Sequence, residues 1–325
     1  MHFSIDGIFK INNQHDFEDL CLQIFAFQYN KIDIYKKYCN LLGKHPVNIN
    51  SYREIPFLPI EFFKTHKIAG QIDSDTKYFQ SSGTTGQQLS KHYVTDLNIY
   101  ESSIITNFQQ SFGPVDQFIF LSLLPNYLSQ ANSSLVYMMN YLNHISGNAD
   151  SSFYLNDIKL LIKRLSYYES ENQKVFLTGV SYALLNLVKV YNSPLANTII
   201  METGGMKGRG KEIIREELHH ILQSAYPLAQ IISEYGMTEL LSQAYYTGKG
   251  FKCPNWMQIL IRDINDPLHL LETGETGGIN IIDLANVNSI SFIATQDLGR
   301  VLPDSTINVL GRFDNSDIRG CNLLV

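Results

Sequence analysis

Between residues 118 and 245 the sequence alternates short apolar runs with longer amphipathic stretches, and this alternation limits the possible folds more than any other feature. Short apolar runs bounded by turn residues predict buried strands, and the longer stretches have the apolar spacing of helices. We expect strands at 118–123, 174–178, 198–201 and 231–234, and helices at 133–142, 157–168, 182–190, 210–224 and 238–245. Strands that alternate with helices predict an α/β fold with mixed, partly parallel sheets flanked by helices.

The segments on either side have their own patterns. Residues 17–28 and 32–42 carry apolar side chains at helical spacing, and a proline-rich extended piece follows at 55–60. After residue 256 strand patterns dominate, at 257–261, 278–282, 289–294 and 307–310. We therefore predict three parts: a helical N-terminal segment at 1–78 packed on the core, an α/β core at 79–256, and a β-rich C-terminal subdomain at 257–325.

The composition argues against several classes of protein. With a net charge of −6 the chain lacks the basic balance of a nucleic-acid-binding domain, although a local loop can still bind an anion. No apolar run approaches the ~18 residues of a membrane span, and residues 1–13 lack the pattern of a signal peptide. The four cysteines include no CxxC pair, so a zinc site has little support. We expect a cytoplasmic protein with no nucleic-acid partner and no integral membrane association.

The first candidate motif is the hydroxyl-rich loop Ser81-Ser82-Gly83-Thr84-Thr85-Gly86. Glycines let the backbone approach a ligand closely, and the Ser and Thr hydroxyls add hydrogen-bond donors, so such a loop can wrap a polyphosphate. It is not a Walker loop, because Gly86 is followed by Gln87 and Gln88 instead of Lys and Ser or Thr. Taken alone, the loop is equally consistent with a solvent-exposed turn.

Two further motifs come at the ends of predicted strands, where open α/β sheets bind their ligands. They are Thr203-Gly204-Gly205-Met206 and Ser233-Glu234-Tyr235-Gly236-Met237-Thr238-Glu239. Tyr235 is suited to stacking on a base, Thr238 to binding a phosphate, and Glu239 to holding Mg²⁺ through its carboxylate. The alternatives are an ordinary turn for the first motif and, for the second, a helix that Thr238 caps and Glu239 stabilises through the helix dipole.

The remaining motifs lie near the C-terminus: Thr295-Gln296-Asp297-Leu298-Gly299-Arg300 and Gly311-Arg312-Phe313-Asp314. Asp297, expected in a loop between β-type stretches, is suited to accepting hydrogen bonds from both hydroxyls of a ribose, and a hairpin turn with a salt bridge is the alternative. Cys321 lies in the ending Arg319-Gly320-Cys321-Asn322, where a neighbouring cation favours a thiolate. A buried cysteine in a terminal strand is the alternative there.

The order and spacing of the phosphate-type loop and the motifs that follow it resemble the adenylate-forming superfamily, which includes acyl-CoA synthetases, luciferase and peptide-synthetase adenylation domains. The resemblance runs from about residue 79 to the C-terminus. Three features look like the branch of the luminescence acyl-protein synthetases and phenylacetate ligases. They are the Ser-Ser opening of the first loop, the stretch at 55–64 and the ending at 317–322.

This resemblance implies a large α/β domain with a β-rich subdomain, and ATP and Mg²⁺ as cofactors. It assigns phosphate, adenine and other nucleotide contacts to three groups of residues: Ser81, Ser82, Gly83, Thr84, Thr85 and Gly86; Gly204, Gly205, Met206 and Tyr235; and Glu234, Gly236 and Met237. It further places Thr238 on the α-phosphate, Glu239 on the metal, Asp297 and Arg312 on the ribose, and the transferred acyl group on Cys321.

Two departures from the superfamily pattern accompany this resemblance. Eleven residues follow Asp314, so we expect no mobile lid domain, and Gln296 replaces the usual glycine before Asp297. The favoured function is activation of a carboxylic acid, fatty or aromatic, as acyl-AMP, with transfer of the acyl group to Cys321 or to an external acceptor protein. Apolar residues at 127–137 and 240–245 are expected to line the acyl pocket. The alternatives are a non-catalytic nucleotide- or acyl-binding partner subunit and an aryl- or acyl-CoA ligase.

Overall fold

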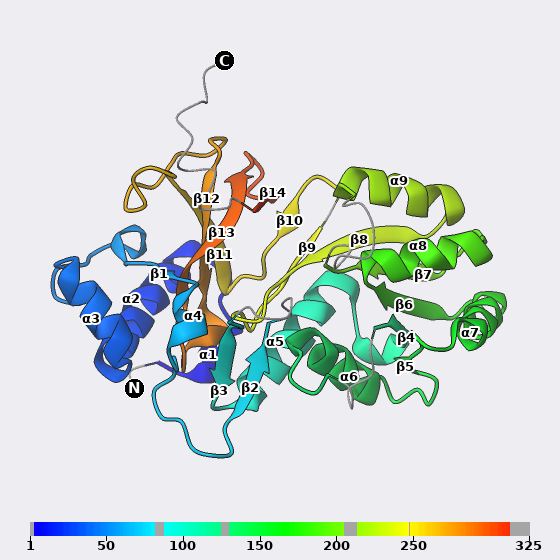
Figure 1. Cartoon of the computed structure of the whole chain (residues 1–325), viewed down its shortest axis with the longest axis horizontal. Helices are drawn as coiled ribbons and strands as arrows, with labels where there is room; N and C mark the ends of the chain where they lie inside the picture. Colours follow the sequence, from blue (N-terminus) through cyan, green and yellow to red (C-terminus); the bar gives the residue numbers. More distant parts are fainter. Residues whose placement is uncertain (1–2, 82–87, 125–129, 205–212, 247, 313–325) are drawn as a thin grey trace. The chain divides into compact units, whose positions relative to one another are not determined.

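A computed structural model describes residues 3–81, 88–124, 130–204, 213–246 and 248–312 (Figure 1). The chain forms two compact units, which are described separately. The antiparallel unit comprises residues 1–103, 238–242 and 249–325, and the parallel unit comprises residues 104–237 and 243–248. The three-part division at 1–78, 79–256 and 257–325 stays a prediction. No helix in the described ranges is long and apolar enough to cross a membrane.

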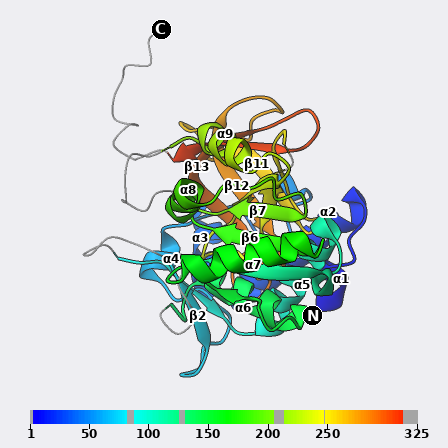
Figure 2. The same ribbon diagram turned by 90° about the vertical axis from the view of Figure 1, so that its right-hand side faces the viewer.

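The parallel unit is a sheet in the strand order β5-β4-β6-β7-β8-β9, in which all neighbours are parallel except β8 and β9. Its strands are β4 (Phe118–Leu123), β5 (Ser152–Phe153), β6 (Lys174–Gly179), β7 (Thr198–Glu202), β8 (Gln230–Tyr235) and β9 (Ala244–Tyr246). Its helices are η2 (Val115–Gln117), α6 (Ser134–Ser146), α7 (Ile158–Ser170), α8 (Ser181–Val190) and α9 (Arg215–Ala225). The four long helices alternate with the strands along the chain and lie alongside the sheet (Figure 2). This confirms the predicted α/β fold with a partly parallel sheet.

In the antiparallel unit the strands pair in the order β11-β12-β13-β14-β10, with neighbours antiparallel. Its strands are β10 (Phe251–Lys252), β11 (Met257–Arg262), β12 (Gly277–Asp283), β13 (Phe292–Val301) and β14 (Ile307–Arg312). Its other elements are α1 (Ile5–Ile8), α2 (Gln14–Lys31), α3 (Asp33–Leu41), η1 (Tyr52–Glu54), β1 (Leu58–Pro59), α4 (Phe62–Thr65), the hairpin β2 (Lys77–Gln80)–β3 (Lys91–Val94) and η3 (Leu284–Asn286). Helix α5 (Leu97–Phe112) begins in this unit and ends in the other.

Local sequence signals account for where several helices begin. The side chains of Asn13, Ser133 and Asp157 accept hydrogen bonds from backbone N–H groups three residues on, which caps α2, α6 and α7. Helix α6 ends at Gly147, whose φ of +67° is the left-handed conformation that favours glycine at a helix C-terminus. These caps explain why the helices predicted near 133–142 and 157–168 are confirmed.

The core of the parallel unit is formed by apolar strands that are covered on both faces. Every residue of β4 is buried, as expected for a strand in a parallel sheet between helix layers. The ring of Phe108 on α5 lies 5.5, 5.3 and 5.1 Å, between centroids, from the rings of Phe118, Phe120 and Phe176. Burying each such ring contributes about 1.5–3 kcal/mol to stability.

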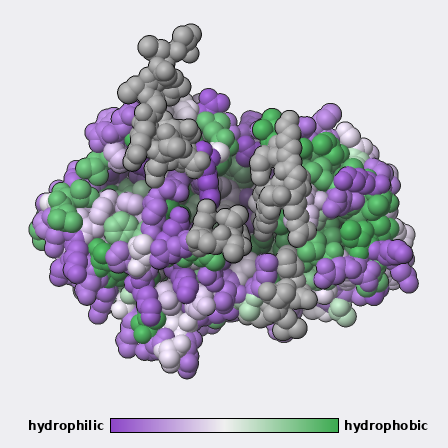
Figure 3. Space-filling view, viewed as in Figure 1, coloured by the Kyte–Doolittle hydropathy of each residue, from purple (hydrophilic) through white to green (hydrophobic). Residues whose placement is uncertain are grey.

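On the face shown in Figure 3, polar and apolar residues are interspersed at the surface, including the part over α3.

The prediction of a helix at 238–245 is wrong. Residues 238–243 are turns and irregular backbone, and residues 244–246 form β9, which pairs with β8. The segment 239–243 is buried, so its backbone polar groups need partners. Side chains distant in sequence supply them, as described below, and they replace the hydrogen bonds of a helix. The alternative in which Thr238 caps a helix is therefore also wrong.

Two other local predictions need correction. Asp297 does not lie in a loop: it is inside β13, which extends over 292–301 and not over 289–294. The helix predicted at 210–224 begins at Arg215 as α9, and residues 205–212 lie outside the described ranges. Asp297 lies in a strand because β12 and β14 pair with the two sides of β13 and so extend it beyond the predicted end at residue 294.

Candidate functional site

The residues predicted to bind a nucleotide are divided between the two units. Several lie outside the described residues: Ser82, Gly83, Thr84, Thr85, Gly86, Gly205 and Met206. Cys321, predicted to carry the acyl group, also lies outside them. Ser81, at the start of the hydroxyl-rich loop, is described. Its backbone N–H donates to the Ser90 carbonyl at 3.1 Å, and its hydroxyl accepts from the Ser90 N–H at 3.0 Å. These bonds continue the ladder of the β2–β3 hairpin beyond its two strands.

In the antiparallel unit, the central residue is Glu239, whose side chain is almost fully buried, with 5% of the residue exposed. Burial raises the pKa of the Glu239 carboxyl, and a hydrogen bond from Ser90 and the positive charges of Arg312 and Lys64 oppose that rise. A buried carboxylate with cations nearby, on a segment that is not a helix, has no role as a helix cap. A carboxyl whose pKa is shifted by burial and by nearby charges is a candidate functional group.

His92, which sequence reasoning missed, holds the residue before Glu239. This histidine on β3 is fully buried, and its Nδ1 lies 3.0 Å from the Thr238 carbonyl oxygen. Because a carbonyl can only accept, Nδ1 carries the proton and donates it. Burial lowers the pKa of His92 to about 4, so the ring is neutral near pH 7. Its Nε2 is buried without a hydrogen-bond partner among the described residues. A single histidine in a strand gave no signal for this contact.

Asp297 and Arg312 face each other on paired strands of the same unit. They are register partners in β13 and β14, and the Arg312 Nε lies 3.2 Å from the Asp297 Oδ1. The Asp297 residue is 7% exposed, whereas the Arg312 side chain is 76% exposed. The two residues predicted for the ribose are thus brought together by strand pairing, with the carboxylate buried and the guanidinium at the surface.

In the parallel unit, the predicted residues lie at the carboxyl ends of β7 and β8, which are neighbouring parallel strands. The Thr203 hydroxyl donates to the Glu234 Oε2 at 2.9 Å. A Cβ at Gly236 would lie 2.6 Å from the Glu234 Oε1, so any other residue there would require the Glu234 carboxylate to move. Gly204 has φ +59°, a conformation that favours glycine. Tyr235, which ends β8, is 9% exposed. Both glycine turns predicted from the sequence therefore have a structural cause.

Glu202 and Ser233, which the sequence did not single out for chemistry, complete this edge of the sheet. Ser181 donates to the Glu202 Oε2 at 3.4 Å, and the Nε2 of His219 lies 2.7 Å from the Ser233 hydroxyl. Burial raises the pKa of Glu202. Burial also raises the pKa of Glu234 to about 7, with the neighbouring Glu202 charge adding to the rise and the Thr203 hydrogen bond opposing it.

The unfolding free energy is expected to depend on Glu234 between about pH 4.5 and 7. In that range the unfolded carboxyl has lost its proton and the folded one keeps it, so stability falls as the pH rises. Glu234→Gln should remove up to about 3 kcal/mol of this fall. Urea unfolding at several pH values measures the effect, and Glu217→Gln, on the exposed side of α9, is the matched control. An unchanged slope in Glu234→Gln would assign the fall to other groups.

The described residues limit how many protein ligands the predicted Mg²⁺ can have. They contain no group of three His, Cys, Asp or Glu side chains that could hold a metal by itself. Mg²⁺ is commonly held by one or two carboxylates together with substrate phosphates. The buried Glu239 carboxylate fits that second arrangement, in which the protein supplies one ligand and the nucleotide supplies others.

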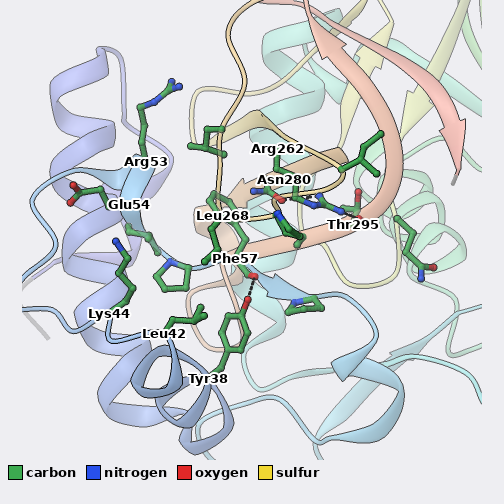
Figure 4. Close-up of a pocket in the computed structure, with 18 of the residues that line it drawn as sticks. Tyr38, Leu42, Lys44, Arg53, Glu54, Phe57, Arg262, Leu268, Asn280 and Thr295 are labelled. Atoms are coloured by element: carbon green, nitrogen blue, oxygen red, sulfur yellow. Dashed lines mark hydrogen bonds between the residues drawn. The ribbon is translucent and has the colours of Figure 1, made fainter. Parts of the chain in front are cut away.

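The antiparallel unit also contains a cavity of about 510 Å³ (Figure 4). The proline-rich stretch at 55–59 forms one wall, where β1 pairs with β13 and the Tyr38 hydroxyl donates to the Phe57 carbonyl at 3.1 Å. Figure 4 shows Arg262, Asn280 and Thr295 together on the opposite wall. Arg262 is buried, and it donates to the carbonyls of Ile279 and Thr295. None of the described residues predicted to bind the nucleotide lines this cavity, but Thr295 and Gln296, which precede Asp297 in its motif, do.

Comparison with solved structures places the fold. The chain is similar to a 2-hydroxyisobutyryl-CoA ligase in complex with 2-HIB-AMP and CoA, with a TM-score of 0.69, 11% identity, and coverage of 93% of this chain and 70% of that one. It is also similar to ATP-bound MatB from Rhodopseudomonas palustris, with a TM-score of 0.50, 14% identity and 75% of this chain covered. A third similar structure is a luciferase-like enzyme from the mealworm Zophobas morio, with a TM-score of 0.52, 15% identity and 76% of this chain covered. The chain spans 50% of the length of MatB and 60% of the mealworm enzyme.

At these identities the likeness shows the fold, which is that of adenylate-forming enzymes. A search of functionally curated proteins found no match. The sequence itself is more specific, because a family model described as acyl-protein synthetase, LuxE, matches residues 8–325. The match includes the glycine turns, Glu239 and Asp297 described above, and it extends over almost the whole sequence. The chain therefore belongs to the LuxE family of acyl-protein synthetases.

Proposed function

We propose that this chain uses ATP to activate a carboxylic acid as an acyl adenylate and passes the acyl group to a cysteine thiol. The observation that carries the proposal is the match of residues 8–325 to the acyl-protein synthetase family. The buried Glu239 carboxylate and the Asp297–Arg312 pair support it, because they are the groups that the reaction needs near phosphate and ribose. The acid is fatty or aromatic, and the acceptor is Cys321 or a cysteine of another protein.

The chemistry follows from the weakness of a carboxylate as an electrophile. A carboxylate oxygen attacks the α-phosphorus of ATP, the bond to the β-phosphate oxygen breaks, and pyrophosphate leaves. A thiolate then attacks the acyl carbon of the mixed anhydride, and AMP leaves with the bonding electron pair. When bound, Mg²⁺ offsets the negative charge that develops on the phosphates. In this proposal Thr238 binds the α-phosphate, Glu239 holds the metal, and Asp297 accepts hydrogen bonds from the ribose.

The other nucleotide contacts are assigned to the loops at strand ends. Ser81 and the loop that follows it bind the β- and γ-phosphates through hydroxyl and N–H groups. Gly204 and the residues after it, with Tyr235, Gly236 and Met237, frame the adenine. Glu234 stands beside Tyr235 and is oriented by Thr203.

The described cysteines support Cys321 or an external thiol as the acceptor. Burial raises the pKa of both Cys39 and Cys253 to about 12, and it raises the pKa of Cys21 as well. A thiol with a raised pKa stays protonated at neutral pH and is a poor nucleophile. The three thiols in the described part of the chain are therefore poor candidates for carrying an acyl group.

An acyl-CoA ligase is the second candidate function. The similarity to a 2-hydroxyisobutyryl-CoA ligase, which extends over 93% of this chain, favours it. In that case the acyl group passes to the thiol of CoA, and no residue of this chain becomes acylated. A non-catalytic partner subunit that binds the nucleotide or the acyl group is the third reading.

ATP–pyrophosphate exchange with a panel of fatty and aromatic acids tests the proposal. Exchange that requires an acid from the panel supports adenylation, and added CoA separates the two enzyme readings, because only a ligase releases acyl-CoA. Nucleotide binding without exchange for any acid would leave the non-catalytic reading. The cytoplasmic location stays a prediction.

Asp297→Ala is expected to weaken ATP binding more than it harms stability. Loss of the ribose hydrogen bonds to a charged group costs roughly 1.5–3 kcal/mol, which is about a 10- to 100-fold rise in Kd. The ion pair lost at the same time has an exposed partner in Arg312 and contributes at most about 1 kcal/mol. Calorimetric titration with ATP and thermal unfolding measure the two effects. Arg312→Ala removes the same ion pair and leaves the carboxylate, so its Tm shows how much of the change in stability comes from the ion pair. Unchanged ATP affinity with a large fall in Tm would assign Asp297 a structural role.

A further inference from the structure

Thr238 is half-buried and residues 239–242 are buried, yet the segment 238–242 has no regular secondary structure. A backbone of this kind keeps one conformation only if other groups satisfy its N–H and C=O groups. We propose that Asn286 and Asp283 are the positioning residues that hold this segment and so aim the Glu239 carboxylate. The inference rests on the proposed function, because it concerns the residue assigned there to hold Mg²⁺ with ATP.

Asn286 holds the backbone of Glu239 itself. It lies at the end of η3, is fully buried, and its Nδ2 donates to the Glu239 carbonyl at 2.7 Å. The same nitrogen donates to the Ile290 carbonyl at 3.1 Å, so both of its hydrogens are used. Its Oδ1 is buried without a hydrogen-bond partner in the described ranges. Among the described residues, the Asn286 side chain therefore acts as a donor only, and one of its two N–H groups binds the Glu239 carbonyl.

Asp283 holds the residues that follow. This fully buried residue ends β12, and its Oδ2 accepts from the Leu241 N–H at 2.9 Å. Its Oδ1 accepts from the Ser242 hydroxyl at 2.7 Å and from the Ala285 N–H at 3.1 Å. The Ser242 hydroxyl in turn accepts from the Trp256 Nε1 at 2.8 Å. A carboxylate is suited to this position, because all its partners are donors.

The loop that carries these residues is itself anchored. Gln28 on α2 is fully buried, and its Nε2 donates to the carbonyls of Asn286 and Val287, both at 3.1 Å. Its Oε1 accepts from the Ser291 N–H at 3.1 Å. The support for Glu239 therefore extends from α2 through the 286–291 loop to the 239–242 segment.

This arrangement predicts which property Asn286 controls. Without the amide, the Glu239 carbonyl loses its partner and the carboxylate is no longer held in one direction. Partners that orient a metal ligand commonly matter by about 10- to 100-fold for metal affinity or activity. The effect should be confined to ATP bound together with Mg²⁺, because metal-free ATP does not use Glu239.

The test is calorimetric titration of Asn286→Ala with ATP, once in Mg²⁺ and once in EDTA. We expect affinity for ATP in Mg²⁺ to fall about tenfold, with affinity in EDTA unchanged. Asp283→Asn, which is isosteric, should do the same, since one amide cannot accept from donors on both sides. Tyr35→Phe is the matched control: it removes a buried hydrogen bond of 2.7 Å to the Pro56 carbonyl in the same unit, so it lowers the Tm without changing either affinity.

A second comparison shows whether Asn286 acts through Glu239. In a Glu239→Gln background, Asn286→Ala should cause no further loss of affinity in Mg²⁺, because the effects of coupled residues are not additive. Equal losses in Mg²⁺ and EDTA, or additive losses in the double variant, would overturn the inference. A wild-type chain that binds ATP but shows no pyrophosphate exchange with any acid would instead overturn the proposed function, so the two failures are distinguishable.

Discussion

Glu239→Gln is expected to lower the rate of ATP–pyrophosphate exchange by about 100- to 1,000-fold, the range seen when one preorganised electrostatic group is removed from an active site. Mg²⁺ prefers charged oxygen ligands, and an amide oxygen carries no net charge. The described residues offer no cluster of other ligands that could take its place. The protein should still fold, because Gln has the same shape and can still accept a hydrogen bond from Ser90.

The measurement is exchange as a function of Mg²⁺ concentration, with thermal unfolding alongside. Glu54→Gln, on the exposed surface of the same unit, is the control for loss of one negative charge and should exchange like wild type. If Glu239→Gln exchanged at the wild-type rate at every Mg²⁺ concentration, the metal role would be removed, and the buried carboxylate would be left with a structural role only.

The second large effect is expected at Cys321. Incubation with ATP, Mg²⁺ and a labelled carboxylic acid should place hydroxylamine-sensitive label on this residue, and Cys321→Ser should carry none. The reason is chemical: a thioester forms only at a thiolate, and burial raises the pKa of the cysteines within the described ranges. Arg319, two residues away in sequence, is expected to favour ionisation of the Cys321 thiol.

Mass spectrometry of digested protein locates the label. Cys253→Ser is the control, because it removes a cysteine without touching the C-terminal motif, and it should be labelled like wild type. Pyrophosphate exchange should continue in Cys321→Ser, since adenylation precedes transfer. Label that persists in Cys321→Ser, or acyl adenylate that forms while no cysteine is labelled, would contradict the prediction and indicate an external acceptor.

The candidate site could be predicted only in part. Gly204 and Gly236 were recognisable because their reason is local: one has a positive φ, and the other lies against the Glu234 carboxylate two residues away. Glu239 was also identified, but for the wrong local reason, since no helix begins there. His92 and Asn286 were missed, because they contact the 238–239 backbone through hydrogen bonds to carbonyls that lie 146 and 47 residues away in the sequence. The spacing of residues in the sequence does not predict hydrogen bonds between segments so far apart.

By itself, the sequence determined the order of strands and helices from 118 to 235 except for the short strand β5 (Ser152–Phe153), because strands that are covered on both faces read as continuous apolar runs. It also determined the glycine turns and the family. Only the tertiary structure decided the path of residues 238–243, the extension of β13 through Asp297, and the pairing of Asp297 with Arg312. The physical reason is the same in each case: a buried backbone adopts whichever conformation satisfies its hydrogen bonds, and here the partners come from distant strands and loops.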